Sequence, residues 1–250
     1  MAILHLLGTG AAVSDPHRTT TMLAVENNDS IIAIDCGADA VQKLMQANAD
    51  ISKLKALIIT HEHADHVSGF PLFMERIWLL GRTKPLLVYG IKEAIEQAKR
   101  VHDSFDTSDW PNYPEIEWHE FSYQENSLVL SDDNWEITAS PGIHSVPVVG
   151  LRILNKENNN ILAYSCDTEF AQNIIALAKD SQILVHEASG NFPGHSTALE
   201  AAQVATQANS QRLILVHLPP KEYLNNKLLA KARAEFANLD KGIEGGKYEF

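Results

Sequence analysis

Residues 58–66 read Ile-Ile-Thr-His-Glu-His-Ala-Asp-His, an apolar run followed by crowded metal-binding side chains. Alternate residues of an extended chain face the same side, so His61 and His63 are expected to point together. Asp65 and His66 then turn toward a second position. Imidazoles with a few carboxylates suit Zn²⁺, and also Mn²⁺ or Fe²⁺. The stretch therefore predicts a metal-dependent hydrolase with a dinuclear centre.

Three further ligand-type side chains stand where other predicted strands end. His144 lies in a loop, Asp167 ends the run 161–166, and His217 ends the run 213–216. Each of them alone could equally be structural. Together they fit one design, in which side chains from strand ends converge on one edge of the sheets. Two metal ions at such an edge can clamp a phosphoryl oxygen between them.

Two residues are candidates for acid–base catalysis. Glu187 closes the apolar run 183–185 after one histidine, and His195 precedes a helical pattern over Thr197–Asn209 with Ser196 as the expected N-cap. A histidine there could donate a proton to a leaving oxygen, and Glu187 could orient it. The alternative interpretation is that His195 only occupies a loop.

Short runs rich in branched residues alternate with helical patterns along the 250 residues. This pattern favours a layered α/β or αββα sandwich over a simple parallel sheet, with one domain spanning residues 1–250. The predicted strands are Ile3–Leu7, Met22–Val25, Ile31–Ile34, Ala56–Thr60, Leu86–Tyr89, Glu136–Ala139, Val148–Leu154, Ile161–Ser165, Ile183–His186 and Leu213–His217. The predicted helices are Ala38–Ala47, Pro71–Leu80, Lys92–Ser104, Phe170–Lys179, Thr197–Asn209 and Leu224–Phe236.

The charge of the chain argues against some partners. The formal net charge is −12, and no Lys or Arg interrupts the acidic stretch between Arg100 and Arg152. Because polyphosphate binding depends on clustered Lys and Arg, we expect no DNA partner and rank large RNA below small nucleotides. No apolar run is long enough to cross a membrane. Two cysteines cannot build a disulfide framework and no signal-peptide pattern is present, so a cytoplasmic location is expected.

The segment Asp103–Pro114 is too long for a tight connection, so it is predicted to be a loop. Its aromatic residues Phe105, Trp110 and Tyr113 could form a lid that stacks on a base. The alternative is that these side chains pack the loop itself or form a dimer contact.

The sequence resembles the metallo-β-lactamase superfamily, and specifically its ribonuclease Z-like branch. The His-x-His-x-Asp-His signature indicates the superfamily. The branch is indicated by the motifs Leu6-Leu7-Gly8-Thr9-Gly10 with Arg18, Ile34-Asp35-Cys36-Gly37, Leu80-Gly81-Arg82, His186-Glu187-Ala188-Ser189 and His195-Ser196-Thr197-Ala198. The resemblance extends from about Ile3 to His217.

The resemblance implies a four-layer αββα fold, two zinc ions and a homodimer. Position by position, it implies that the first metal is bound by His61, His63 and His144. It implies that the second metal is bound by Asp65, His66 and His217, with Asp167 bridging the two. It further implies that His195 is the general acid supported by Glu187, and that Asp65 also orients the attacking hydroxide.

Departures from the branch bear on the substrate. Members that mature transfer RNA carry an RNA-gripping arm between the counterparts of His144 and Asp167. Here that interval holds only Ser145–Cys166, which predicts a hairpin and no arm. Cys166 also replaces the usual glycine before the bridging aspartate. These changes leave the predicted metal ligands intact and weaken the transfer-RNA interpretation.

The preferred hypothesis is therefore a phosphodiesterase acting on a small phosphodiester, above all a 3′,5′-cyclic nucleotide. Short arm-less members of the branch resemble enzymes that degrade cyclic nucleotides, including pyrimidine cyclic nucleotide defence signals. The second hypothesis is a transfer-RNA 3′ processing endonuclease whose RNA is held by a partner subunit. The third is a non-catalytic or cofactor-biosynthesis protein of the same fold. Thiolester or lactam hydrolysis ranks below these, and the sequence leaves metal identity and base preference open.

Overall fold

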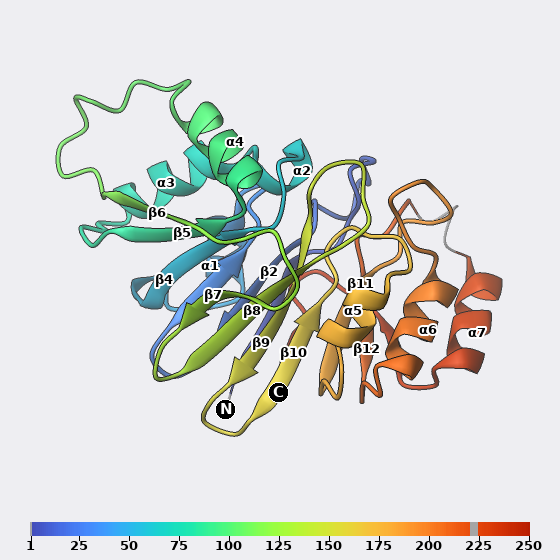
Figure 1. The fold of residues 1–250 in the computed structure, drawn as a ribbon. Helices are drawn as coiled ribbons and strands as arrows, with labels where there is room; N and C mark the ends of the chain where they lie inside the picture. The colour runs from blue at the N-terminus through green and yellow to red at the C-terminus, as the bar shows by residue number, and fades with distance from the viewer. Residues whose placement is uncertain (1, 221–224) are drawn as a thin grey trace.

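Two seven-stranded sheets lie face to face in the computed structural model, which describes residues 2–220 and 225–250. Helices cover the outer face of each sheet (Figure 1). The predicted four-layer αββα arrangement is thereby confirmed. That residues 1–250 form one domain stays a prediction. In the described part of the chain, no helix has the length and apolarity needed to span a bilayer.

The first sheet has the strand order β14-β1-β2-β3-β4-β5-β6. Its strands are β14 (Lys247–Glu249), β1 (Ile3–Gly8), β2 (Met22–Glu26), β3 (Ile31–Ile34), β4 (Leu54–Ile59), β5 (Leu86–Gly90) and β6 (Ile116–Glu120). Its helices are α1 (Ala40–Gln46), α2 (Ala64–Val67), α3 (Phe70–Leu79) and α4 (Lys92–His102), with a short 3₁₀ turn over Ile51–Lys53. Strands β3 to β6 run parallel to one another.

The second sheet has the order β13-β12-β11-β10-β9-β8-β7. Its strands are β13 (Leu239–Lys241), β12 (Leu213–Val216), β11 (Ile183–Glu187), β10 (Asn160–Tyr164), β9 (Val149–Asn155), β8 (Trp135–Pro141) and β7 (Ser127–Ser131). The covering helices are α5 (Gln172–Leu177), α6 (Ala198–Gln207) and α7 (Asn226–Glu235). Strands β10 to β13 are parallel, while β9 and β10 form the predicted antiparallel hairpin without an arm.

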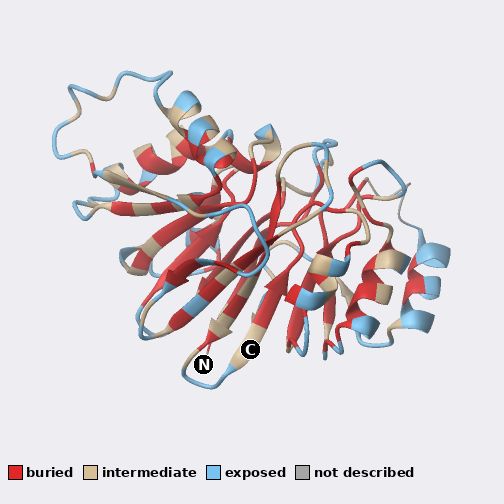
Figure 2. Cartoon of the chain, in the orientation of Figure 1, coloured by how far each residue is buried: buried red, intermediate tan, exposed pale blue. Residues whose placement is uncertain are grey.

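The core consists of the apolar faces between these layers (Figure 2). One cluster joins the inner faces of both sheets and also includes the helices that cover the first sheet, and a second lies between the second sheet and its helices. Strands β3 and β12 are buried along their whole length, as expected for parallel strands covered on both faces. Each sheet contains a block of parallel strands, β3 to β6 in the first and β10 to β13 in the second. The carboxyl ends of these strands can therefore meet at one edge of the sandwich.

All ten predicted strands are present, but four observed strands are not among them: β6, β7, β13 and β14. Strand β6 is half-buried and mixes Trp with charged residues, so it lacks a clean alternation of apolar and polar positions. The N-cap assigned to Ser196 is wrong by one residue. Thr197 caps α6 and forms a capping box with Glu200, while the Ser196 hydroxyl donates to the Thr168 carbonyl. The predicted start of the last helix, Leu224, lies outside the described residues.

Trp135 joins the two sheets. Its side chain is fully buried on β8, and its Nε1–H donates to Ser30 Oγ at 2.9 Å in the turn between β2 and β3. We expect Trp135→Ala to lower the free energy of unfolding by about 3–5 kcal/mol, because it leaves a cavity between the sheets. Urea denaturation followed by circular dichroism measures this loss. Trp110→Ala, at a half-buried loop position, is the control, and an equal loss in both variants would contradict the assignment.

Candidate metal centre

Three histidines converge at the end of β4 and in the β8–β9 loop. His61 and His63 follow β4 on either side of a bend at Glu62, and the Nε2 of His61 lies 3.2 Å from the Nδ1 of His63. The Nε2 of His144 lies 3.1 Å from the same Nδ1 atom. The ligand atoms of all three lie within 4.8 Å of one another. This spacing places them around one point, as three ligands of a single metal ion require.

A second group stands beside the first. Asp65 and His66 lie in the single turn of α2, so the chain direction changes after His63 and turns them away from the first group. Asp167 follows β10 and His217 follows β12. The ligand atoms of these four residues also lie within 4.8 Å of one another. The Oδ2 of Asp65 is 3.2 Å from the Nε2 of His217 and 3.5 Å from that of His66.

Asp167 lies between the two groups. Its Oδ2 is 3.3 Å from His217 Nε2 and 3.6 Å from His66 Nε2 in the second group. The same atom is 4.0 Å from the Nε2 atoms of His61 and of His144 in the first group. One carboxylate is therefore within reach of both groups, which is the position that a bridging ligand occupies.

The residues fit divalent metal ions. His66 Nε2 and Asp167 Oδ1 are buried and have no hydrogen-bond partner, a costly arrangement for a polar atom unless a cation satisfies it. In four histidines, the Nδ1 atom faces away from the cluster and is hydrogen-bonded to a neighbouring group. The Nε2 atom of each ring then faces the cluster, where it can bind a metal ion. These contacts are His61 Nδ1 to Thr60 Oγ1, His66 Nδ1 to Asp35 Oδ2, His144 Nδ1 to the Gly194 carbonyl and His217 Nδ1 to Ser189 Oγ, at 3.1, 2.8, 2.8 and 2.6 Å. Such outer partners orient imidazoles in metal sites.

Asp35 is absent from the residues that the sequence predicts for the site. Its fully buried carboxylate accepts hydrogen bonds from His66 Nδ1 and from the backbone N–H and hydroxyl of Thr60. The Thr60 hydroxyl in turn accepts from His61 Nδ1. A single acid therefore orients one histidine of each group. The available signal is an aspartate directly after the fully apolar strand β3, next to the strand that carries the histidines.

Burial and charge set the protonation of the cluster. Burial, reinforced by the neighbouring His66, lowers the pKa of His61 well below its ordinary value. Burial also opposes charge on His66, but Asp167 and Asp35 outweigh it and raise the pKa of His66 well above its ordinary value. Against burial, His217 and His66 hold the pKa of Asp167 well below its usual range. The Asp167 carboxylate therefore stays ionised and favours positive charge beside it, which a divalent cation also supplies.

The predicted acid–base pair is brought together beside these groups. His195 Nδ1–H donates to Glu187 Oε1 at 2.9 Å. Glu187 is fully buried and also accepts from the backbone N–H groups of Thr168, Ser189 and Ser196. The His195 ring stacks on His217 with centroids 5.5 Å apart. Burial lowers the pKa of His195, but the hydrogen bond and charge of Glu187 outweigh it and raise this pKa.

Three strand ends at the site have left-handed backbone. Asp35, Cys166 and His217 have φ values of 61°, 51° and 49°. This region favours glycine, which explains why glycine is usual at the position of Cys166. The Cys166 side chain is buried, and its Sγ lies 3.0 Å from Thr60 Oγ1 and 3.6 Å from His61 Nδ1. Cys166 therefore adds a contact behind His61 that a glycine would lack.

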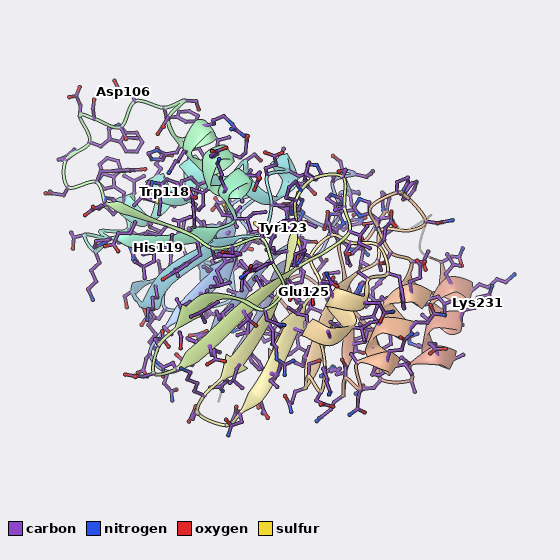
Figure 3. All side chains as sticks on the ribbon, viewed as in Figure 1. Asp106, Trp118, His119, Tyr123, Glu125 and Lys231 are labelled. Atoms are coloured by element: carbon purple, nitrogen blue, oxygen red, sulfur yellow. The ribbon has the colours of Figure 1, made fainter. Side chains whose placement is uncertain are left out.

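The predicted loop Asp103–Pro114 has no helix or strand. Trp110 stacks on Trp78 of α3 with centroids 4.6 Å apart, and Tyr113 contacts the same ring edge-on. Figure 3 shows Asp106 of this loop at the outer end of the molecule, beyond α4. These contacts favour the packing interpretation for Trp110 and Tyr113 over a lid on the same subunit. Phe105 remains 60% exposed.

Gly194 links the loop of His195 to the first group. Its φ is +82°, and a Cβ there would lie 2.7 Å from His144 Nδ1. We expect Gly194→Ala to displace His144 and weaken the binding of added Zn²⁺, used as a probe ion, by about 10–100-fold, the usual effect of disturbing an outer partner. Competition titration with a chelating dye measures this affinity. Gly81→Ala is the matched control, because Gly81 also has a positive φ of +86° but nothing within 4 Å of the added Cβ. Equal zinc affinity in the two variants would contradict the role of Gly194.

Comparison with known proteins places these features in a family. Residues 2–241 match the family described as "Anti-Pycsar protein Apyc1". Ribonuclease Z of Methanothermobacter thermautotrophicus is 28% identical over 291 residues, covering 94% of this chain and 92% of that protein.

Two solved structures are similar to the fold. The metallo-β-lactamase fold protein YhfI from Bacillus subtilis has a TM-score of 0.83 at 21% identity, covering 100% of this chain and 99% of that one. The short form of human tRNase Z has a TM-score of 0.81 at 21% identity, covering 99% and 98%. These likenesses establish the metallo-β-lactamase fold. With the match over residues 2–241, the chain belongs to the Anti-Pycsar protein Apyc1 family, in the ribonuclease Z-like branch of the metallo-β-lactamase superfamily.

Proposed function

We propose that the protein is a dinuclear-metal phosphodiesterase that hydrolyses a 3′,5′-cyclic nucleotide. The observation that carries this proposal is the position of His195. Its ring lies against His217 of one ligand group and 4.9 Å from His144 of the other, and Glu187 fixes its orientation. A proton donor beside a two-metal site suits a reaction in which a poorly leaving oxygen departs from phosphorus.

The first ion would be held by His61, His63 and His144, and the second by Asp65, His66 and His217, with Asp167 shared. The proposed ions are two Zn²⁺, with Mn²⁺ or Fe²⁺ as alternatives for the same ligand types. When bound, they supply positive charge to the phosphoryl oxygens and lower the pKa of water. Asp65, whose Oδ2 faces both His66 and His217, is placed to orient the attacking oxygen. His195 protonates the departing ribose oxygen.

Several features support a small substrate. The chain belongs to a family named for countering Pycsar, which agrees with pyrimidine cyclic nucleotide signals as the target. The β9–β10 connection is a tight hairpin and offers no arm to grip RNA. The net charge of −12 also disfavours a long polyanion.

Transfer-RNA 3′ processing is the second candidate, and the likeness to ribonuclease Z over 94% of the chain favours it. A non-catalytic or cofactor-biosynthesis role ranks third, because the site retains every predicted ligand and the acid–base pair. We also propose a cytoplasmic homodimer. The exposed apolar side chains Met45, Leu79 and Leu80 on and beside α1 and α3 support a subunit contact.

The metal requirement is tested with bis(p-nitrophenyl) phosphate. We expect zinc- or manganese-loaded protein to hydrolyse it, and chelation to abolish turnover reversibly. Asp65→Ala and His61→Ala should each lower kcat/KM at least about 100-fold, since even outer partners of metal ligands contribute about 10–100-fold. His119→Ala, at a half-buried position on β6, is the control and should retain activity. Turnover that survives chelation would refute the metal mechanism.

The substrate is tested by comparing 3′,5′-cyclic nucleotides with a precursor transfer RNA under identical metal loading. We expect turnover of the cyclic nucleotides, detected as nucleoside monophosphate by chromatography, and little or no cleavage of the RNA. Cleavage of the RNA at its 3′ end without cyclic-nucleotide turnover would replace the first candidate by the second.

The acid role of His195 predicts a pH effect. The pKa of His195 is raised in the folded protein, so its protonated form persists to higher pH and the alkaline limb of kcat/KM is displaced upward. Glu187→Gln removes the charge that raises this pKa, so the alkaline limb should move to lower pH. The pH–rate profile of cyclic-nucleotide hydrolysis measures the shift. Glu120→Gln on the exposed end of β6 is the control, and superimposable profiles for Glu187→Gln and wild type would contradict the pairing.

A further inference from the structure

Two residues in the β10–α5 loop, Thr168 and Glu169, directly follow Asp167. Neither is a proposed metal ligand or proton donor. Both contact the two other loops that build the centre. One is the β8–β9 loop, which carries His144, and the other is the β11–α6 loop, which carries His195. The dipeptide therefore lies where three loops of the site meet.

The dipeptide holds the β8–β9 loop immediately before His144. The Ile143 N–H donates to Thr168 Oγ1, and the Glu169 N–H donates to the Ile143 carbonyl, both at 2.9 Å. Gly142 packs so closely that an added Cβ would lie 3.1 Å from the Thr168 side chain. Because both backbone polar groups of Ile143 are engaged, the β10–α5 loop sets where His144 begins.

The Glu169 carboxylate reaches the β11–α6 loop. Its Oε1 accepts from the Gly194 N–H at 2.8 Å. The Gly194 carbonyl in turn accepts from His144 Nδ1–H, also at 2.8 Å. Gly194 is thus held on its N–H by Glu169 and on its carbonyl by His144. Since His195 is the next residue, the placement of Gly194 also sets that of the proton donor.

The loop of the proton donor is held on both sides of His195. Gly194 precedes it and is bonded to Glu169, and an ionised carboxylate makes a stronger hydrogen bond to N–H than a neutral acceptor does. Ser196 follows it, and the Ser196 hydroxyl donates to the Thr168 carbonyl at 2.7 Å. The same dipeptide therefore anchors the residues on either side of the proton donor.

These contacts form a path between the first ligand group and the proton donor. The Nε2 of His144 faces His63 of that group, whereas its Nδ1 ends on Gly194. A displaced loop would therefore move the imidazole, and an imidazole fixed by a metal ion would in turn fix the loop. Such coupling is reciprocal for binding free energies. The bond from Glu169 to Gly194 completes the path, because it anchors the loop to the segment that follows Asp167.

We propose that Glu169 is a positioning residue that couples metal binding by His61, His63 and His144 to the placement of His195. The catalytic part of this inference rests on the proposed function, whereas the binding part does not. The loop of His195 is then held firmly only when the first group is occupied. The proton donor is therefore put in place together with the centre that it serves.

The binding part is tested with the full chain and added Zn²⁺ as the probe ion. In Glu169→Ala, competition titration with a chelating dye should show one zinc affinity falling about 10-fold, the lower end of the range for outer partners. Glu169→Gln keeps an oxygen acceptor and should recover most of the loss. Glu26→Ala is the matched control and should bind zinc as wild type does. Glu26 is also a partly buried carboxylate and accepts from His5 Nε2 at 2.7 Å, at the end of β2 away from the metal groups.

Amide hydrogen exchange measured by NMR gives a readout that does not depend on turnover. In wild type, saturating Zn²⁺ should slow the exchange of the backbone amides of residues 190–196 about 5-fold or more, the lower end of ordinary coupling between sites. In Glu169→Ala this effect should disappear, whereas Glu26→Ala should retain it. The double variant Glu169→Ala/Gly194→Ala should lose less zinc affinity than the sum of its single variants, because both changes act on Gly194.

The catalytic part is tested by phosphodiester hydrolysis. Glu169→Ala should lower kcat without displacing the alkaline limb of the pH–rate profile, because Glu169 is bonded to Gly194 and not to His195. Glu187→Gln displaces that limb, so the two variants separate placement of the proton donor from its charge environment.

Equal zinc affinity in Glu169→Ala and wild type would overturn the coupling. So would exchange of residues 190–196 that Zn²⁺ leaves unchanged in wild type, a measurement that stands even if Glu169→Ala does not fold by circular dichroism. Wild-type protein in which Zn²⁺ slows this exchange but no phosphodiester is hydrolysed would instead refute the proposed function and leave the coupling in place.

Discussion

The carboxylate of Asp35 is buried at the end of β3 and accepts hydrogen bonds from His66 and from both polar groups of Thr60. Its partners stand at the end of β4 and in α2, so this one acid fixes the chain on either side of the His61–His66 turn. A buried carboxylate is tolerated only when its hydrogen bonds are satisfied, and removing a partner leaves an uncompensated charge. The local conformation that directs the histidines inward is therefore coupled to the stability of the first sheet.

Glu187 has the corresponding role in the second sheet. It is also fully buried at a strand end, and it accepts from Thr168, Ser189, His195 and Ser196. These donors belong to the loops that follow β10 and β11, so one carboxylate sets the spacing between the Asp167 segment and the His195 segment. The two sheets thus each bring one buried acid to the shared edge, and the proposed metal groups lie between them. The hydrogen bonds to these two buried carboxylates hold the loops of the site in position.

Much of this architecture is predictable from local patterns. The apolar runs that end β4, β10 and β12 are visible in the sequence because strands covered on both faces are apolar, and their ends point to His61, Asp167 and His217. Strands β6, β13 and β14 are not predictable in this way, because they are short or half-buried edge elements whose pairing depends on distant chain. The role of Gly194 was beyond sequence patterns for a related reason. That role arises from a contact between segments far apart in sequence, because the Gly194 carbonyl accepts from His144 Nδ1.

The left-handed backbone at Asp35, Cys166 and His217 has a consequence for how the protein can change over time. Each non-glycine residue in this conformation costs on the order of 1 kcal/mol, so three junctions around one site consume a substantial share of a marginal stability. Glycine at these junctions would relieve the backbone cost, yet it would remove the side chains that face the centre. Thermal robustness and turnover are consequently in conflict at these three positions. Compensating stability has to come from sites elsewhere, such as the buried seam between the sheets around Trp135.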